Sequence, residues 1–116
     1  MHRLTHHLIG ADQGSVLMFS DFADNGPMWT GDGAREKRLS VTFSDTFRAP
    51  PIVHVGISMW DTGGDTNQRA DLRAHNITNT GFDLVFRTWG DSRVARIRAD
   101  WMALGELIDV DDWQVY

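Results

Sequence analysis

Residues 80–91 read Thr-Gly-Phe-Asp-Leu-Val-Phe-Arg-Thr-Trp-Gly-Asp, and this stretch predicts how the rest of the chain folds. The apolar residues Phe82, Leu84 and Phe86 recur at every second position, and the charged residues Asp83 and Arg87 take the opposite parity. This alternation is typical of a half-buried β-strand. Trp89 and Gly90 follow at the end of the strand, where the chain turns. The pattern therefore predicts a large flat ring that a ligand can approach.

Five further stretches show strand patterns, with turn residues between them: residues 14–20, 38–43, 52–60, 69–77 and 94–104. Residues 21–36 contain Asn-Gly-Pro and Gly-Asp-Gly without sustained periodicity, which predicts a long surface loop. Met28 and Trp29 favour an ordered loop. No stretch has convincing helical periodicity. Short strands separated by regularly spaced turns predict an all-β fold, a six-stranded antiparallel β-sandwich.

Length and composition are those of one soluble domain. The chain has 116 residues, of which 41% are hydrophobic and 23% are charged. We expect an N-terminal extension over residues 1–13, the sandwich over residues 14–105, and a tail over residues 106–116 that docks on the domain or on an oligomer. The amino terminus lacks the apolar core of a secretory signal, and no apolar run is long enough to insert in a membrane. If the protein acts outside the cell or on a particle surface, another route must export it.

Charge and motif content exclude several function classes. The formal net charge of −5 argues against binding to nucleic acid, which needs a basic surface. The absence of cysteine excludes disulfides and a cysteine nucleophile. No nucleophile elbow, phosphate-binding glycine loop or zinc-binding histidine pair is present. Asp24 and Asp32 could serve a glycosidase only in a deep groove, which a small sandwich does not offer. We therefore predict a protein that is not an enzyme and that needs no cofactor.

Carboxylates and histidines also occur outside the organising strand. Two acidic groups resemble calcium ligands, although neither has an EF-hand pattern, and solvated loops explain both: Asp109, Asp111 and Asp112, and Asp61, Asp65 and Asn67. His54 and His75 lie on predicted strand faces, where a histidine that binds no metal is the simpler interpretation. The sequence therefore predicts no metal site.

The polar positions of several strands carry alternating charge: Arg69, Asp71, Arg73, Arg87, Arg96, Arg98 and Asp100. A solvated sheet face with pairs between neighbouring strands explains this pattern. That is the preferred explanation of the pattern taken alone; the alternative is a polar interface between protomers, because symmetric oligomers can meet through faces whose charges interlock. The sequence alone leaves both explanations open.

The order of several short motifs resembles the H-type lectin domain, a family that includes the snail agglutinins and the carboxy-terminal domain of the discoidins. The motifs are Arg35-Glu36, Val41-Thr42-Phe43, Pro50-Pro51-Ile52-Val53, Asn67-Gln68-Arg69, Thr80-Gly81-Phe82, Thr88-Trp89 and Asp100-Trp101. The resemblance as a whole covers roughly residues 14–105. The resemblance implies a six-stranded antiparallel β-sandwich that assembles as a homotrimer, sometimes doubled to a hexamer. It also implies that galactose or N-acetylgalactosamine on cell-surface glycans binds in shallow clefts between protomers, with a role in cell adhesion.

Residue by residue, the resemblance places the sugar-binding carboxylate on Asp32, the arginine on Arg69 and the tryptophan on Trp89, with Gly31 and Gly90 beside them. Their chemistry suits a sugar, because a carboxylate accepts hydroxyl protons and a guanidinium donates in a fixed fork. An indole face covers the apolar face of a galactose-type ring. Each residue also has an ordinary explanation: a turn aspartate, a surface arginine paired with Asp71 or Asp61, and a tryptophan under a loop.

Three departures from the family pattern change what the resemblance implies. Gly90 stands where the snail proteins have a histidine, and Ala95 stands where an aromatic residue of the neighbouring protomer closes the cleft. Both changes remove contacts and imply a wider, shallower site that reads the N-acetyl group less well. The family disulfide between the first and fifth strands is also missing. Met18 and Phe86 stand near those positions, and we expect core packing to replace the bond.

Two functions from different classes remain. The first is a multivalent lectin, in which several weak sugar sites on one rigid oligomer act together. The second is a structural or adhesion module of a fibre or particle, which keeps the trimeric fold without binding sugar. Variants at Asp32 and Arg69 that lose glycan binding but keep the trimer would separate the two.

Overall fold

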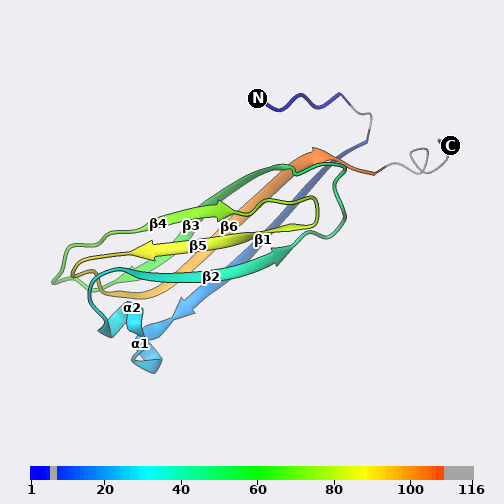
Figure 1. Cartoon of the computed structure of the whole chain (residues 1–116). Helices are drawn as coiled ribbons and strands as arrows, with labels where there is room; N and C mark the ends of the chain where they lie inside the picture. Colours follow the sequence, from blue (N-terminus) through cyan, green and yellow to red (C-terminus); the bar gives the residue numbers. More distant parts are fainter. Residues whose placement is uncertain (6–7, 109–116) are drawn as a thin grey trace.

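Two three-stranded sheets face each other in the computed structural model, which describes residues 1–5 and 8–108 (Figure 1). The strands are β1 (Ile9–Ser20), β2 (Arg35–Thr42), β3 (Ile52–Thr62), β4 (Asp71–His75), β5 (Gly81–Thr88) and β6 (Val94–Glu106). One sheet has the order β1-β6-β3 and the other the order β2-β5-β4, and all paired strands are antiparallel. The predicted six-stranded antiparallel β-sandwich is therefore confirmed.

The ends of several strands differ from the prediction, and β1 and β4 show the reason in the backbone. β1 begins at Ile9 instead of residue 14, because Ile9 already pairs with Glu106 of β6. β4 covers Asp71–His75 instead of residues 69–77. The backbone N–H of Arg69 donates to the Ser92 hydroxyl instead of a neighbouring strand, and Asn76 has a positive φ of 51°. Both ends of β4 are therefore set by local contacts that strand periodicity does not report.

The connection between β1 and β2 contains helices that the sequence did not predict. α1 (Asp21–Asp24) and α2 (Pro27–Thr30) lie at one end of the sandwich (Figure 1). The Asp21 carboxylate accepts the Met28 N–H at 3.0 Å, and Pro27 occupies the start of α2, where a missing N–H costs nothing. Helices this short leave no periodic signal in the sequence. The expectation of a loop without helix is therefore wrong, whereas the expectation of order is confirmed by the burial of Met28.

The core lies between the sheets, and the inward residues of β5 form its centre. Phe82, Leu84 and Phe86 are at most 3% exposed, as their spacing predicts. Met18 of β1 belongs to the same buried cluster, and the Phe19 and Phe86 rings lie 5.3 Å apart. Met18 and Phe86 thus both pack in the core, as expected. Among the described residues, no helix is long and apolar enough to cross a membrane.

Phe86 provides a test of this core. We expect Phe86→Ala to lower the free energy of unfolding by about 3–5 kcal/mol, because it removes a fully buried ring and leaves a cavity. Phe22→Ala is the matched control, since the Phe22 ring is 61% exposed. Urea unfolding at fixed protein concentration measures both variants. Equal losses would contradict the position assigned to Phe86.

Charged residues cover the outer faces of both sheets. On the β2-β5-β4 face, Glu36 Oε1 lies 2.9 Å from Arg87 Nε, and Arg38 Nη1 lies 3.2 Å from Asp83 Oδ2. On the opposite face, Arg96 Nη2 lies 3.0 Å from Asp61 Oδ2. Most of the alternating charges of the sequence thus fall on two separate faces, and two of the arginines pair with a carboxylate of a neighbouring strand: Arg87 with Glu36 and Arg96 with Asp61.

Candidate functional site

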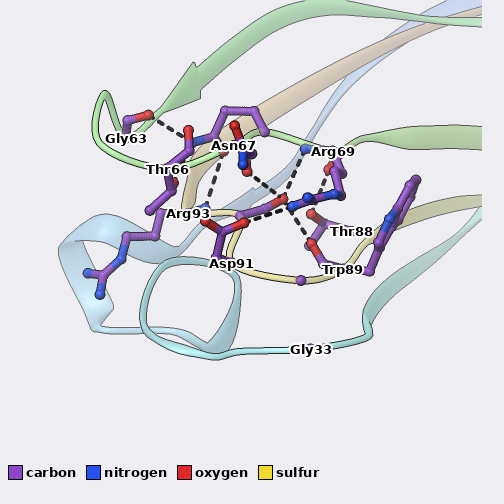
Figure 2. Close-up of polar contacts among 12 residues, drawn as sticks. Gly33, Gly63, Thr66, Asn67, Arg69, Thr88, Trp89, Asp91 and Arg93 are labelled. Atoms are coloured by element: carbon purple, nitrogen blue, oxygen red, sulfur yellow. Dashed lines mark hydrogen bonds and ion pairs between the residues drawn. The ribbon is translucent and has the colours of Figure 1, made fainter.

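The candidate site lies at the end of the sandwich where β5 ends and β2 and β4 begin. Trp89 follows β5 directly and is 46% exposed. The Gly33 N–H donates to the Gly90 carbonyl at 2.9 Å. This hydrogen bond brings the loop that contains Gly31 and Asp32 beside the backbone of Trp89 and Gly90. Three connections that are distant in sequence therefore meet beside the turn that carries Trp89, whose ring projects away from them (Figure 2).

Arg69 is held in the site by a carboxylate that the sequence did not identify. Its Nη1 lies 2.7 Å from Asp91 Oδ1. Asp71 and Asp61, its suggested partners, pair instead with Arg73 and Arg96. Among the described residues, Nε and Nη2 of Arg69 make no hydrogen bond, so N–H donors remain for a ligand. The Asp91 contact fixes the guanidinium without using all of its donors.

Gly90 is required where the Arg69 side chain crosses it. Its φ is +68°, in the left-handed region, and a Cβ placed there would lie 2.8 Å from Arg69 Nη1. Glycine suits both the left-handed backbone and the close approach, whereas a side chain here would be strained and would displace the guanidinium. Gly90 stands where the resemblance expects a histidine. In this chain the Arg69 guanidinium occupies the space where the side chain of residue 90 would begin.

Two buried hydroxyls anchor the backbone of Arg69. The Ser92 hydroxyl accepts the Arg69 N–H at 2.9 Å and lies within hydrogen-bond distance of the Asn67 and Trp89 carbonyl oxygens. The Thr88 hydroxyl donates to the Arg69 carbonyl. Thr88 and Ser92 are at most 1% exposed, so water does not compete for these bonds. The backbone that carries Arg69 is thus attached to both sides of the turn that carries Trp89 (Figure 2).

Arg35 joins the loop before β2 to the turn after β5. The nitrogens of its guanidinium group donate at 2.9–3.2 Å to five backbone carbonyl oxygens, those of Pro27, Met28, Gly33, Gly90 and Ser92. These bonds occupy its fork of donors with backbone acceptors. Arg35 therefore acts as a structural residue that holds the site together.

The Arg69 guanidinium beside Asp91 lowers the pKa of that carboxyl below its usual value of 3.8, chiefly through the side-chain hydrogen bond. When folding lowers the pKa of a carboxyl, that carboxyl stabilises the native state at pH values above its pKa in the unfolded chain. This contribution is lost as the pH falls through the pKa in the folded chain. The contribution of Asp91 is therefore complete at neutral pH.

Acid unfolding tests this linkage. We expect the free energy of unfolding to fall as the pH drops below about 4, and to fall less steeply in Asp91→Asn, because the asparagine has no proton to gain. The measurement is urea unfolding at a series of pH values between about 7 and about 2. The Asp45→Asn variant serves as the control, since Asp45 is an exposed carboxylate without an ion pair among the described residues. Identical pH profiles for Asp91→Asn and the unaltered chain would contradict the linkage.

An open trough of about 480 Å³ lies on the outer face of the β2-β5-β4 sheet and is bounded at one end by Trp89. Three strands or their ends contribute to it: Ala34, Arg35 and Glu36 from β2, Ala70, Asp71 and Arg73 from β4, and Arg87, Thr88 and Trp89 from β5. Its lining contains Trp89 but not Arg69, Gly90 or Asp32. Trp89 is therefore the one predicted site residue that lines the trough.

The structure brings the predicted site residues to one end of the fold to different degrees. Arg69 lies over Gly90, next to Trp89, whereas Asp32 and Gly31 reach the site through the backbone contact of Gly33. The Asp32 side chain is exposed. Ala95, which stands where the resemblance expects the aromatic residue that closes the cleft, is only 4% exposed. Sequence reasoning missed four residues that shape the site: Arg35, Thr88, Asp91 and Ser92.

The suggested calcium groups do not converge within the described residues. Asp61 pairs with Arg96, and none of the described parts of the chain holds three or more His, Asp or Glu side chains placed for a metal ion. The second suggested group, Asp109, Asp111 and Asp112, lies outside the described residues, as does most of the expected tail.

Known proteins resemble this chain both in sequence and in structure. A family model described as the H-type lectin domain matches residues 38–104. ATP synthase subunits region ORF 7 of Fuscovulum blasticum is 56% identical over 107 residues, which are 92% of this chain and 93% of that protein. Discoidin-2 of Dictyostelium discoideum is 37% identical over 76 residues, which are 65% of this chain and 30% of that discoidin.

Solved structures give the same result. Recombinant discoidin II of Dictyostelium discoideum superimposes with a TM-score of 0.74 and 27% sequence identity over 90% of this chain and 40% of that chain. The chain thus spans well under half of each discoidin it matches. Domains of this family bind carbohydrate and are not catalysts. The chain therefore belongs to the H-type lectin domain family and is a carbohydrate-binding module of the lectin type.

Proposed function

We propose that the protein is a multivalent lectin that binds galactose or N-acetylgalactosamine on cell-surface glycans through Asp32, Arg69 and Trp89, in shallow clefts between protomers. The observation that carries the proposal is the half-exposed Trp89 ring beside an arginine that is fixed but retains N–H donors. This combination offers an apolar stacking surface and directional donors within one site. A galactose-type sugar presents an apolar ring face and hydroxyl groups that match the two.

The roles of the individual residues follow from their chemistry. Trp89 covers the apolar face of the sugar ring, and Arg69 donates to ring hydroxyls or to the ring oxygen. Asp32 lies on the neighbouring loop, and its exposed carboxylate accepts hydrogen bonds from hydroxyl groups of the sugar. Gly31 and Gly90 have no side chains, so they leave room for the sugar ring above the backbone. Because Gly90 has no side chain, the site reads the N-acetyl group weakly, and galactose competes well with N-acetylgalactosamine.

The expected affinity makes oligomerisation part of the function. A monosaccharide with roughly fifteen heavy atoms, at about 0.3 kcal/mol per atom, binds with about 4–5 kcal/mol, which corresponds to a Kd near millimolar. One such site does not hold a cell surface. A homotrimer, or a hexamer made from two trimers, presents several sites at once and raises the apparent affinity by about two to four powers of ten.

Retention on immobilised glycans tests the proposal. The purified protein should be retained on multivalent terminal galactose and N-acetylgalactosamine, released by the free sugars, and should have a mass in solution near three or six chains. Glucose-terminated supports serve as the control. A trimer that ignores every glycan would overturn the lectin and favour the structural module of a fibre or particle.

A further inference from the structure

The trough beyond Trp89 has the size and the location of a second binding space. Its volume of about 480 Å³ falls within the range of about 300–1,000 Å³ that is usual for small-molecule sites. We propose that it is an additional sugar subsite, so that the chain binds at least a disaccharide, with the terminal sugar beside Arg69 and the next sugar in the trough. This inference rests on the proposed function and names the ligand class more closely.

The charged side chains of the trough are paired with each other. Glu36 Oε1 lies 2.9 Å from Arg87 Nε, and Asp71 Oδ2 lies 3.0 Å from Arg73 Nε. Arg35, the fifth charged residue, directs its donors to backbone carbonyl oxygens. The charges of these two pairs cancel, and Arg35 adds one positive charge to the lining; the pairs still offer carboxylate acceptors and guanidinium donors. That combination suits a neutral molecule with many hydroxyl groups better than it suits an anion or a cation.

Trp89 connects the trough to the proposed primary site. It lines the trough and directly precedes Gly90, over which the Arg69 guanidinium lies. In Figure 2 the Trp89 ring projects away from the hydrogen-bonded cluster around Arg69. Ala34 and Ala70 keep the walls of the trough low next to this ring. A sugar bound against Trp89 would therefore extend towards the charged pairs of the trough, whose donors and acceptors the primary site does not use.

A sugar fits the trough better than a second copy of the chain. Interface cores are depleted in charged residues, and a docked protein would remove Glu36, Asp71, Arg73 and Arg87 from water together. A disaccharide would leave part of each of these charged side chains in contact with water. Arg73, whose side chain is 64% exposed, can form a hydrogen bond with a hydroxyl without breaking from Asp71.

The test compares sugar length in two variants. Binding of galactose and N-acetylgalactosamine is measured beside a set of disaccharides that end in these sugars and differ in linkage and in the second unit. We expect at least one disaccharide to bind about five- to tenfold more tightly than its terminal sugar. In Arg73→Gln this gain should fall to less than about twofold, while the affinity for the monosaccharide and the mass in solution stay unchanged. Arg98→Gln, on the opposite sheet, is the matched control and should keep the gain.

Three outcomes would overturn the subsite. The first is that no disaccharide binds more tightly than its terminal sugar, although the monosaccharide does bind. The second is that Arg73→Gln weakens the monosaccharide and the disaccharide alike. The third is that Arg73→Gln lowers the mass in solution, which would make the trough an interface between copies. A chain that binds no sugar of any length would instead overturn the proposed lectin function.

Discussion

In Arg69→Ala we expect binding to immobilised galactose to fall by more than about tenfold while the mass in solution is unchanged. The substitution removes charge-assisted hydrogen bonds, which contribute about 1.5–3 kcal/mol each, and leaves Asp91 without its partner. The backbone of residue 69 keeps its bonds to Ser92 and Thr88, so the fold should survive. Asp32→Ala should reduce binding in the same assay, because it removes the proposed acceptor.

Arg96→Ala is the matched control for this prediction, because Arg96 also pairs with an exposed carboxylate but lies on the opposite sheet. It should bind galactose like the unaltered chain. Changes in mass without loss of binding in Arg69→Ala or Asp32→Ala would assign these residues to the interface between protomers, and would contradict their role in the sugar site.

Gly90→Ala is expected to weaken sugar binding several-fold and to lower the free energy of unfolding by about 1–2 kcal/mol. The alanine must adopt a positive φ, and its Cβ would lie 2.8 Å from Arg69 Nη1, so the guanidinium has to move. Sugar retention and urea unfolding, measured on the same sample, report the two effects separately.

Gly33→Ala separates backbone strain from displacement of Arg69. Gly33 also has a positive φ, of 74°, but a Cβ there would meet nothing within 4 Å. Its loss of stability should be similar, whereas its binding should fall less than that of Gly90→Ala. If Gly90→Ala binds sugar as well as the unaltered chain, the position of Arg69 over Gly90 does not matter for recognition.

Strand periodicity predicted the fold because the core imposes it. In β5 the inward residues alternate with outward ones, and a single shift in register would expose Phe82, Leu84 and Phe86 together. The first residues of β1 were harder to identify, because Gly10, Asp12 and Gly14 are typical of turns. Their pairing along β6 overrides this local preference, which only the assembled sheet shows.

The candidate site was predictable only in part. The position of Trp89 at a strand end follows from local sequence, and the resemblance to the lectin family supplied Arg69 and Asp32. The pairing of Arg69 with Asp91 joins residues 22 positions apart and depends on buried Ser92, which fixes the backbone of both connections. Contacts of this kind arise from tertiary packing, and neither periodicity nor turn chemistry encodes them.

The most direct test of the central claim is a titration with free galactose that follows the indole N–H signals of the five tryptophans by NMR. The signal of Trp89, assigned with Trp89→Phe, should shift with a midpoint near millimolar sugar, with no comparable change in the signal of Trp101, which packs against the core. A Trp89 signal that stays in place, while the protein is retained on galactose, would show that the sugar binds elsewhere and would contradict the proposed site.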